Sequence, residues 1–197
     1  MQYDIWAITP TTSATLLRAA ASIAGAGAVT LLTNDVSPYG TGYKLLFTSA
    51  GDDTGITFTI TGIKVGDLTG AYTTEVVTGA NASTASSTNF YTYVDSIVAS
   101  GASAGNVSIG TTGSLALPRT RIKSLYYVGT ANAGSIKVNV NSASGVLLLQ
   151  IDTPAGSGSF SDSVTIPNEG ILTTRSSKTD FAVVTLAEIT NITVFCG

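Results

Sequence analysis

The side chains in this sequence that could do chemistry are few and scattered. Histidine is absent, which removes the commonest general base and the commonest metal ligand. Twelve carboxylates are spread along the chain, and Asp52 and Asp53 form the one adjacent pair. We find no nucleophile motif, phosphate-binding glycine loop or paired-cysteine zinc pattern. We therefore predict that the protein is not an enzyme and binds no metal or cofactor.

Asp52 and Asp53 lie in the turn-like segment AGDDTG. Two adjacent carboxylates could supply ligands to Ca²⁺, which takes about six to eight oxygens. The interpretation we favour is a hairpin turn, in which an aspartate bonds its own backbone and Gly55 takes a left-handed conformation. Cys196 has no basic neighbour that would lower its pKa, so we predict a small apolar filler in the last strand and not a reactive thiol.

The aromatic stretch NFYTYVDS, residues 89–96, is predicted to place Tyr91 and Tyr93 on the same face of a strand. A platform on which carbohydrate rings stack is one interpretation of these tyrosines. Packing in a core or an interface is the one we favour, because no polar set that could grasp a ligand accompanies them. Glu75 is expected to form a surface pair with Lys64 or another strand residue.

The composition predicts a surface that partners cover. The chain of 197 residues is 11% charged, against about 25% in an ordinary soluble domain. A net charge of −3 with nine basic residues leaves no basic stripe, so we predict no nucleic-acid partner. The apolar-leaning residues 16–32 are too short and too interrupted for a membrane span, and no basic residue precedes them as in a signal peptide. We therefore expect synthesis in the cytoplasm, no membrane partner, and assembly.

Residues 1–34 differ from the rest of the chain. Tyr3, Ile5 and Trp6 make an aromatic and apolar start, and an alanine-rich stretch follows. A helix over residues 13–23 is one interpretation, since a serine could cap it and alanine and leucine favour it. An extended arm that enters the first sheet is the other, and we favour it because the start has no helical periodicity. We expect this segment to make contacts outside the first half of the chain.

Short strands rich in β-branched residues and glycine-containing turns follow one another from about residue 43 onward. In ITFTITG, residues 56–62, isoleucine and phenylalanine alternate strictly with threonine, which predicts a strand with one buried and one polar face. SLALPRT, residues 114–120, is predicted to be a hinge, because proline cannot donate to a strand ladder. GVLLLQI, residues 145–151, is continuously apolar, as a strand buried on both faces would be.

This pattern predicts an all-β fold of two small antiparallel β-sandwiches, jelly-roll or immunoglobulin-like, in tandem. The predicted parts are an N-terminal arm over residues 1–34, a first sandwich over residues 35–114 and a second over residues 115–197. A sandwich of roughly 80 residues buries little more than about 60% of its unfolded surface. Each sandwich would therefore be stabilised by a neighbour.

Several segments of the chain resemble known protein modules in their order of strand and turn motifs. In the first half they are FTSAGDDTGITFTITG, TTEVVTG and NFYTYVDS, the last leading to a closing GNV. They resemble a module common in virion-associated proteins of tailed bacteriophages. The second half, from RIKSLYYVG through IDTPAG to ITNITVFCG, looks like another small β-module of phage structural proteins. The connection TGIKVGDLTGAYTTE and the polar insertion RSSKTD depart from these patterns. Neither module has a family active site, so the resemblance implies no functional residue.

The resemblance implies a structural component of a virion, made in the cytoplasm of a host bacterium. We expect first a capsid decoration or cement protein, homo-oligomeric and trimeric at a local symmetry axis, that binds the major capsid protein and stabilises the head. A tail or head–tail accessory protein, arranged as a ring among tail proteins, is the second expectation. A glycan-binding module of a receptor-binding apparatus is the third. The expected interface residues are Tyr3, Ile5, Trp6, Tyr91 and Tyr93.

Overall fold

The fold was analysed in a computed structural model. It describes residues 6–8 by their backbone and, in full, residues 12–37, 40–67, 69–156, 158–167, 170–173 and 180–197. Within these ranges the chain is all-β and antiparallel, as predicted, and contains no α-helix. A search of the same ranges finds no helix that is long and apolar enough to cross a membrane.

The contacts divide the chain into two compact units. The N-terminal unit comprises residues 11–113, and the C-terminal unit comprises residues 1–10 and 114–197. Strand β9 (Val107–Leu117) gives its first residues to the N-terminal unit and its last residues to the C-terminal unit. The first part of the predicted hinge is therefore strand. The domain boundaries that we placed after residues 34 and 114 stay predictions.

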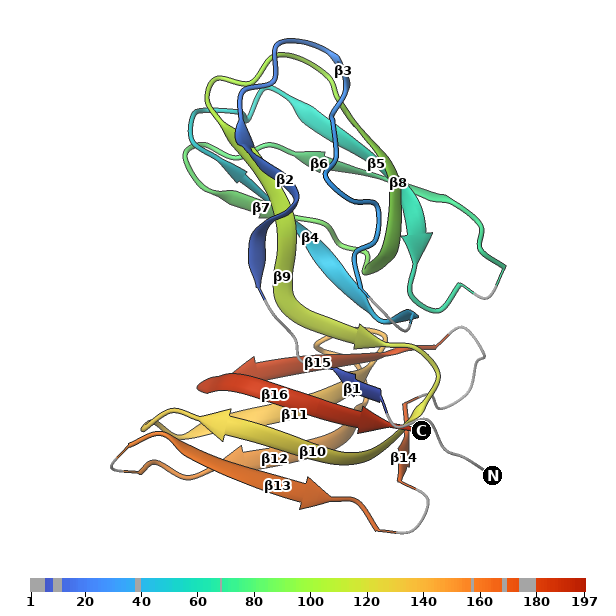
Figure 1. Cartoon of the computed structure of the whole chain (residues 1–197), viewed down its shortest axis with the longest axis vertical. Coiled ribbons are helices and arrows are strands. Elements are labelled where there is room, and N and C mark those ends of the chain that lie inside the picture. The colour runs from blue at the N-terminus through green and yellow to red at the C-terminus, as the bar shows by residue number, and fades with distance from the viewer. Residues whose placement is uncertain are drawn as a thin grey trace. The chain divides into compact units, whose positions relative to one another are not determined.

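The N-terminal unit is β-sandwich-like (Figure 1). Besides β9, its strands are β2 (Ser13–Ala21), β3 (Gly27–Ala28), β4 (Gly42–Ser49), β5 (Thr57–Lys64), β6 (Thr73–Thr78), β7 (Thr84–Ser86) and β8 (Tyr91–Ala99). One run of hydrogen-bonded strands has the order β2–β9–β4–β7, and another has the order β3–β8–β5–β6. The two runs are joined where Tyr43 of β4 pairs with Tyr91 of β8.

Alternation along β5 builds the core of this unit. Phe58 and Ile60 are fully buried, whereas the alternating threonines 57, 59 and 61 are half-buried on the other side. The ring of Phe58 stacks on that of Phe47 from β4, with 4.9 Å between the ring centroids. Two fully buried aromatic rings in stacked contact make this pair a principal anchor between β4 and β5.

The N-terminal segment is extended and not helical. Residues 13–21 form β2, which pairs with β9, so the helix interpretation for residues 13–23 is wrong. Leu17 of β2 is fully buried. The Arg18 guanidinium donates to the carbonyl of Val107 on the neighbouring strand and, at 2.8 Å, to that of Ala21. Leucine and arginine, both good helix formers, are therefore held in a strand by core packing and by cross-strand bonding.

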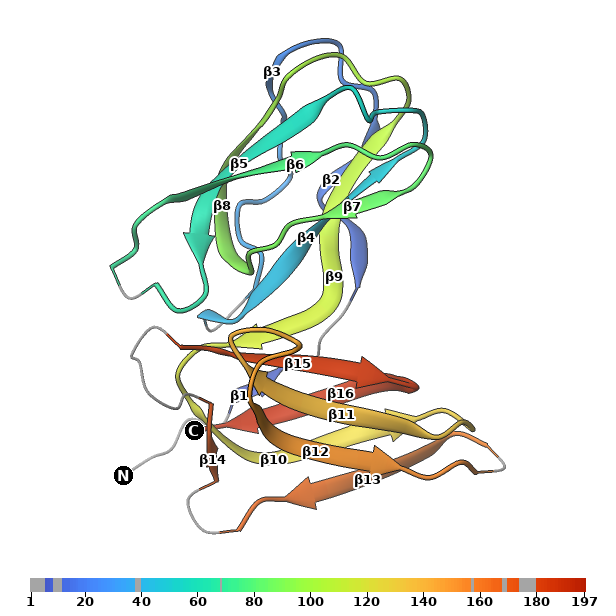
Figure 2. The same cartoon turned by 180° about the vertical axis from the view of Figure 1, so that it is seen from behind.

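The C-terminal unit has two strand layers that lie over one another (Figures 1 and 2). The strands are β1 (Trp6–Ile8), β10 (Arg121–Gly129), β11 (Gly134–Val140), β12 (Leu147–Thr153), β13 (Phe160–Thr165), β14 (Ile171–Leu172), β15 (Ala182–Ala187) and β16 (Ile189–Cys196). One layer has the order β1–β16–β10–β13, with β14 also on β10, and the other has the order β9–β15–β11–β12. Residues 6–8 pair with residues 194–196, which confirms for them the expected contact outside the first half of the chain.

A single residue, Glu188, carries the chain from β15 to β16 and so from one layer to the other. Its φ of 57° lies in the left-handed region, which is uncommon for a residue other than glycine. The Glu188 carboxylate accepts hydrogen bonds from Thr130 Oγ1 at 2.8 Å and Asn132 Nδ2 at 3.1 Å. These bonds lower the pKa of Glu188 and fix the corner to the loop that follows β10.

The apolar run GVLLLQI does not form a strand that is buried on both faces. Its strand, β12, is the last in its layer, with β11 as its paired neighbour among the described strands. Val146 and Leu147 are 52% and 48% exposed. The prediction of two-sided burial is wrong, because continuous apolarity does not distinguish a central strand from an edge strand whose apolar side chains are left uncovered.

Replacing Phe58 by alanine tests the account of this core. We expect Phe58→Ala to lower the free energy of unfolding by about 3–5 kcal/mol, because it removes a buried ring and leaves a cavity. Urea denaturation followed by fluorescence or circular dichroism measures the change. Thr74→Ala on exposed β6 is the matched control and should stay within about 0.5 kcal/mol of wild type. Equal effects of the two substitutions would contradict the assignment of the core.

Candidate interaction surface

The structure describes three of the five residues predicted to form an interface, and their shared interface stays a prediction. Tyr3 and Ile5 lie outside the described residues. Trp6 begins β1, and its backbone pairs with Cys196. Tyr91 is fully buried, and Tyr93 is half-buried.

A β-bulge separates Tyr91 from Tyr93. Lys64 of β5 pairs with Tyr91 and the preceding Ile63 pairs with Tyr93, with a register shift between them. Adjacent residues of β5 face opposite sides of the sheet, so their partners do too. Tyr91 therefore points into the core and Tyr93 away from it. The predicted shared face of the two tyrosines is wrong, and a carbohydrate platform built on both is excluded.

Tyr91 belongs to a polar network centred on Glu75. The Tyr91 hydroxyl donates to Glu75 Oε2 at 3.1 Å. The same carboxylate accepts hydrogen bonds from the backbone N–H groups of Thr88 and Asn89 and from Asn89 Nδ2, the last at 3.0 Å. Burial first, and then the Glu75 charge, raise the pKa of Tyr91 far above its ordinary value. Glu75 thus anchors the loop before β8, where we had expected a surface pair with Lys64 or another strand residue.

Two rows of uncharged side chains lie on the outer face of the β8–β5–β6 sheet. Val76, Thr59 and Val98 lie in one row of paired residues across the three strands, and Thr74, Thr61 and Ser96 lie in the next. Val76 is 59% exposed and Val98 is 42% exposed. Glu75, although it lies on β6, is turned to the loop at residues 88–91. We call these six side chains the Thr–Val face: Thr59, Thr61, Thr74, Val76, Ser96 and Val98.

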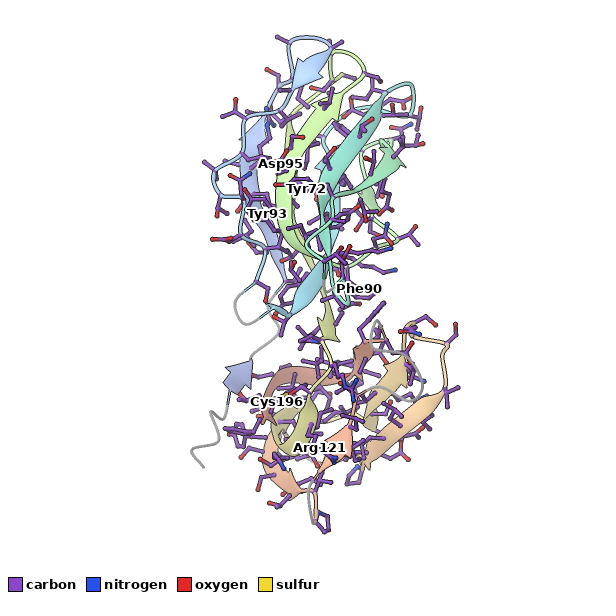
Figure 3. All side chains as sticks on the ribbon, turned by 90° about the vertical axis from the view of Figure 1, so that its right-hand side faces the viewer. Tyr72, Phe90, Tyr93, Asp95, Arg121 and Cys196 are labelled. Carbon is purple, nitrogen blue, oxygen red and sulfur yellow. The ribbon has the colours of Figure 1, made fainter. Side chains whose placement is uncertain are left out.

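A second group, the Tyr72 cluster, adjoins the Thr–Val face and consists of Tyr72, Tyr93 and Asp95 (Figure 3). Tyr72 is 57% exposed, and the Asp95 carboxylate raises the pKa of its hydroxyl by charge and by hydrogen bonding. Tyr93 contributes in the same direction. Tyr72 was not among the predicted interface residues. Its exposure could have been predicted from the alternation of the strand. Residue 72 lies two positions before residue 74 and therefore faces the same side as the exposed positions 74 and 76 of β6.

Asp52 and Asp53 take different structural roles. Asp52 Oδ1 accepts hydrogen bonds from the N–H group of Thr54 at 3.2 Å and from its hydroxyl at 2.7 Å, and these bonds lower the pKa of Asp52. Asp53 is buried, and its Oδ1 accepts from the N–H group of Ala104 at 2.7 Å, which ties two loops together. The turn interpretation is confirmed for Asp52, but Gly55 is not among the glycines with positive φ.

The described residues include no group that could hold a metal ion, and their cysteine is buried. Across the described ranges, no three side chains of the types His, Cys, Asp or Glu lie close enough to share a metal ion. Cys196 is fully buried in β16, and burial raises the pKa of its thiol to about 11. Its prediction as a packed filler of the last strand is confirmed.

The sequence and the structure were compared with known proteins. No family model, no curated protein and no solved structure matches the chain. Assignments of function therefore depend on the surfaces described above and on the resemblance in sequence pattern.

Burial of Tyr91 makes stability depend on alkaline pH. Because its folded-state pKa is raised, the stabilising effect of neutral Tyr91 is complete below about pH 10, the unfolded value. It is lost as the pH rises above that value, at up to about 1.4 kcal/mol per pH unit for one proton. We expect Tyr91→Phe to remove this part of the slope between about pH 10 and pH 11.5. Urea unfolding at a series of pH values measures it.

Tyr126→Phe is the matched control for this experiment, because it removes the hydroxyl of a tyrosine that is 41% exposed. The expected result is a shallower alkaline loss for Tyr91→Phe and a loss close to wild type for Tyr126→Phe. A slope for Tyr91→Phe that equals the wild-type slope would show that Tyr91 is accessible to solvent in the folded protein.

Proposed function

We propose that this protein is a structural component of a tailed-bacteriophage virion and not an enzyme. In the first form of the proposal it is a capsid decoration or cement protein, made in the host cytoplasm, that assembles with itself on the head, contacts the major capsid protein and stabilises the shell. In the second form it is a tail or head–tail accessory protein arranged as a ring. The resemblance in sequence pattern supports the class.

The observation that carries the proposal is the Thr–Val face. Its six side chains are uncharged, and its two valines are about half exposed. Burying such a face against a partner removes apolar area from water and requires no charge to be desolvated. Pleated strands hold these side chains on fixed spacings, so the surface is pre-organised for contact. A docking surface of this kind suits a particle component better than a catalyst.

The carboxylates support the same proposal because several of them accept hydrogen bonds that hold turns and loops in place. Asp52 and Asp67 each accept hydrogen bonds within a turn, from Thr54 and Thr69. Glu75 anchors the loop before β8, and Glu188 fixes the corner between β15 and β16, as described above. Side chains committed to holding backbone in place are poorly suited to moving protons for a substrate.

A lysine placed on the Thr–Val face tests the proposal. We expect Val76→Lys to weaken binding to phage heads that lack the protein by at least about tenfold, or about 1.4 kcal/mol, because a charge would be buried without a partner. Thr165→Lys, at an exposed position of β13, is the control and should bind like wild type. Co-sedimentation with the heads measures binding, and heating the loaded heads measures shell stability.

The outcomes separate the forms of the proposal. Binding to heads that Val76→Lys weakens and that raises their resistance to heat supports the decoration role. Binding to isolated tails alone would replace it with the tail or head–tail accessory role. If the protein binds neither particle, the structural proposal is wrong.

A glycan-binding role in a receptor-binding apparatus is the second candidate, and the Tyr72 cluster favours it. An exposed tyrosine beside a carboxylate can stack on a sugar ring and accept hydrogen bonds from its hydroxyl groups. If this role holds, Tyr72→Ala should abolish binding on an array of neutral hexose polysaccharides. Tyr126→Ala, at a 41% exposed tyrosine in the C-terminal unit, should leave it unchanged. If wild-type protein binds none of the polysaccharides, this candidate fails.

A further inference from the structure

Strand β12 is an edge strand that lacks the usual protection against pairing. Its free edge follows the uncharged run from Val146 to Ile151, with Asp152 as the first charge. Val146 and Leu147 are about half exposed. Edge strands are usually guarded by charges, prolines or bulges that prevent pairing with another chain. β12 has one register shift, opposite Val138 and Asn139, and no other of these devices between residues 146 and 151.

The core of the C-terminal unit is also incompletely covered at this edge. Ile136 and Val138 of β11 are fully buried. Their partners on β12, Ile151 and Leu149, face the same side of the layer but are only half-buried. A strand added beside β12 would extend the layer and cover these two side chains. Apolar burial and completed backbone hydrogen bonds would then both favour the addition.

Three other described edge strands, β13, β6 and β7, differ from β12. On β13, Asp162 and its serine neighbours are exposed. On β6, the exposed positions alternate between threonine and Val76. β7 is only three residues long. The apolar edge that best matches β12 among these strands is therefore β12 itself, in a second copy of the chain.

We propose that two copies of this protein pair through β12, antiparallel and across a two-fold axis, to form one continuous sheet. With the axis at Gln150, Leu149 of each copy lies opposite Ile151 of the other on the same side of the layer, and Asp152 lies opposite Leu148. No like charges meet in this register, and the net charge of −3 opposes association only weakly. The contact is isologous and closes after two copies. This proposal rests on the self-assembly proposed above, and it replaces the expected trimer with a dimer.

A lysine at the edge tests the pairing in the full chain. We expect sedimentation equilibrium of wild-type protein to show a dimer, and Leu147→Lys to raise its dissociation constant about 100-fold, because each dimer would bury two such lysines at about tenfold each. Tyr126→Lys, with 41% exposure at the original side chain against 48% for Leu147, is the control and should dimerise like wild type. Circular dichroism melting checks that both variants fold.

A cysteine scan locates the axis. Opposed residues of antiparallel strands have Cα atoms about 4.5–5.5 Å apart, which suits a disulfide. Of Leu148→Cys, Leu149→Cys and Gln150→Cys, the variant at the axis should give a covalent dimer on mild oxidation, and Val76→Cys should not. Native Cys196 is buried and does not interfere. A monomeric wild type, or a dimer that neither Leu147→Lys nor the scan affects, would overturn the pairing. A dimer with these properties that binds no phage particle would leave the pairing intact and refute the proposed virion role.

Discussion

The alternation of apolar and threonine side chains along β5 is the constraint on which the N-terminal unit depends. Because successive side chains point to opposite faces, Phe58 and Ile60 can fill the core only if Thr59 and Thr61 face outward. β8 and β6 pair along the two edges of β5, with Ile97 and Val77 buried and with Ser96 and Thr74 on the outer face. The same constraint thus produces the stacked aromatic core and the uncharged outer face. A chain with 21 glycines and 11% charged residues keeps that outer face hydrated mainly through hydroxyl groups.

The two units differ in how they treat the edges of their layers. In the N-terminal unit, residues 27–28 pair along β8. In the C-terminal unit, β1 pairs along β16 and joins the start of the chain to its end. β12 combines an uncharged apolar run with an edge along which no described strand pairs. Backbone groups at such an edge can bond to water or to another strand. The chain therefore has two separate surfaces through which we propose that it associates. The Thr–Val face of the N-terminal unit is proposed to contact the particle, and the edge of β12 in the C-terminal unit is proposed to contact a second copy.

The sequence predicted those features that depend on local pattern. Alternation predicted the strands, the aspartates predicted a turn at Asp52, and the absence of a basic neighbour predicted a packed Cys196. The errors share a physical origin in pairing between distant residues. The bulge that turns Tyr91 inward depends on its register with Lys64 and Ile63 and leaves no local signal. An apolar run has the same sequence whether its strand is central or at an edge. The strand at residues 13–21 is fixed by packing against β9, which overrides the helix propensity of alanine and leucine.

The most direct measurement of the central claim is an electron cryomicroscopy reconstruction of phage particles produced in cells that express this protein. The claim is that the protein acts through its surfaces, as a component of an assembled particle. The account predicts density for it on the head, with the Thr–Val face against the shell and neighbouring copies joined through β12. Density on the head in which that face points to solvent and no two copies meet at β12 would contradict the account, and so would particles that contain no density for the protein.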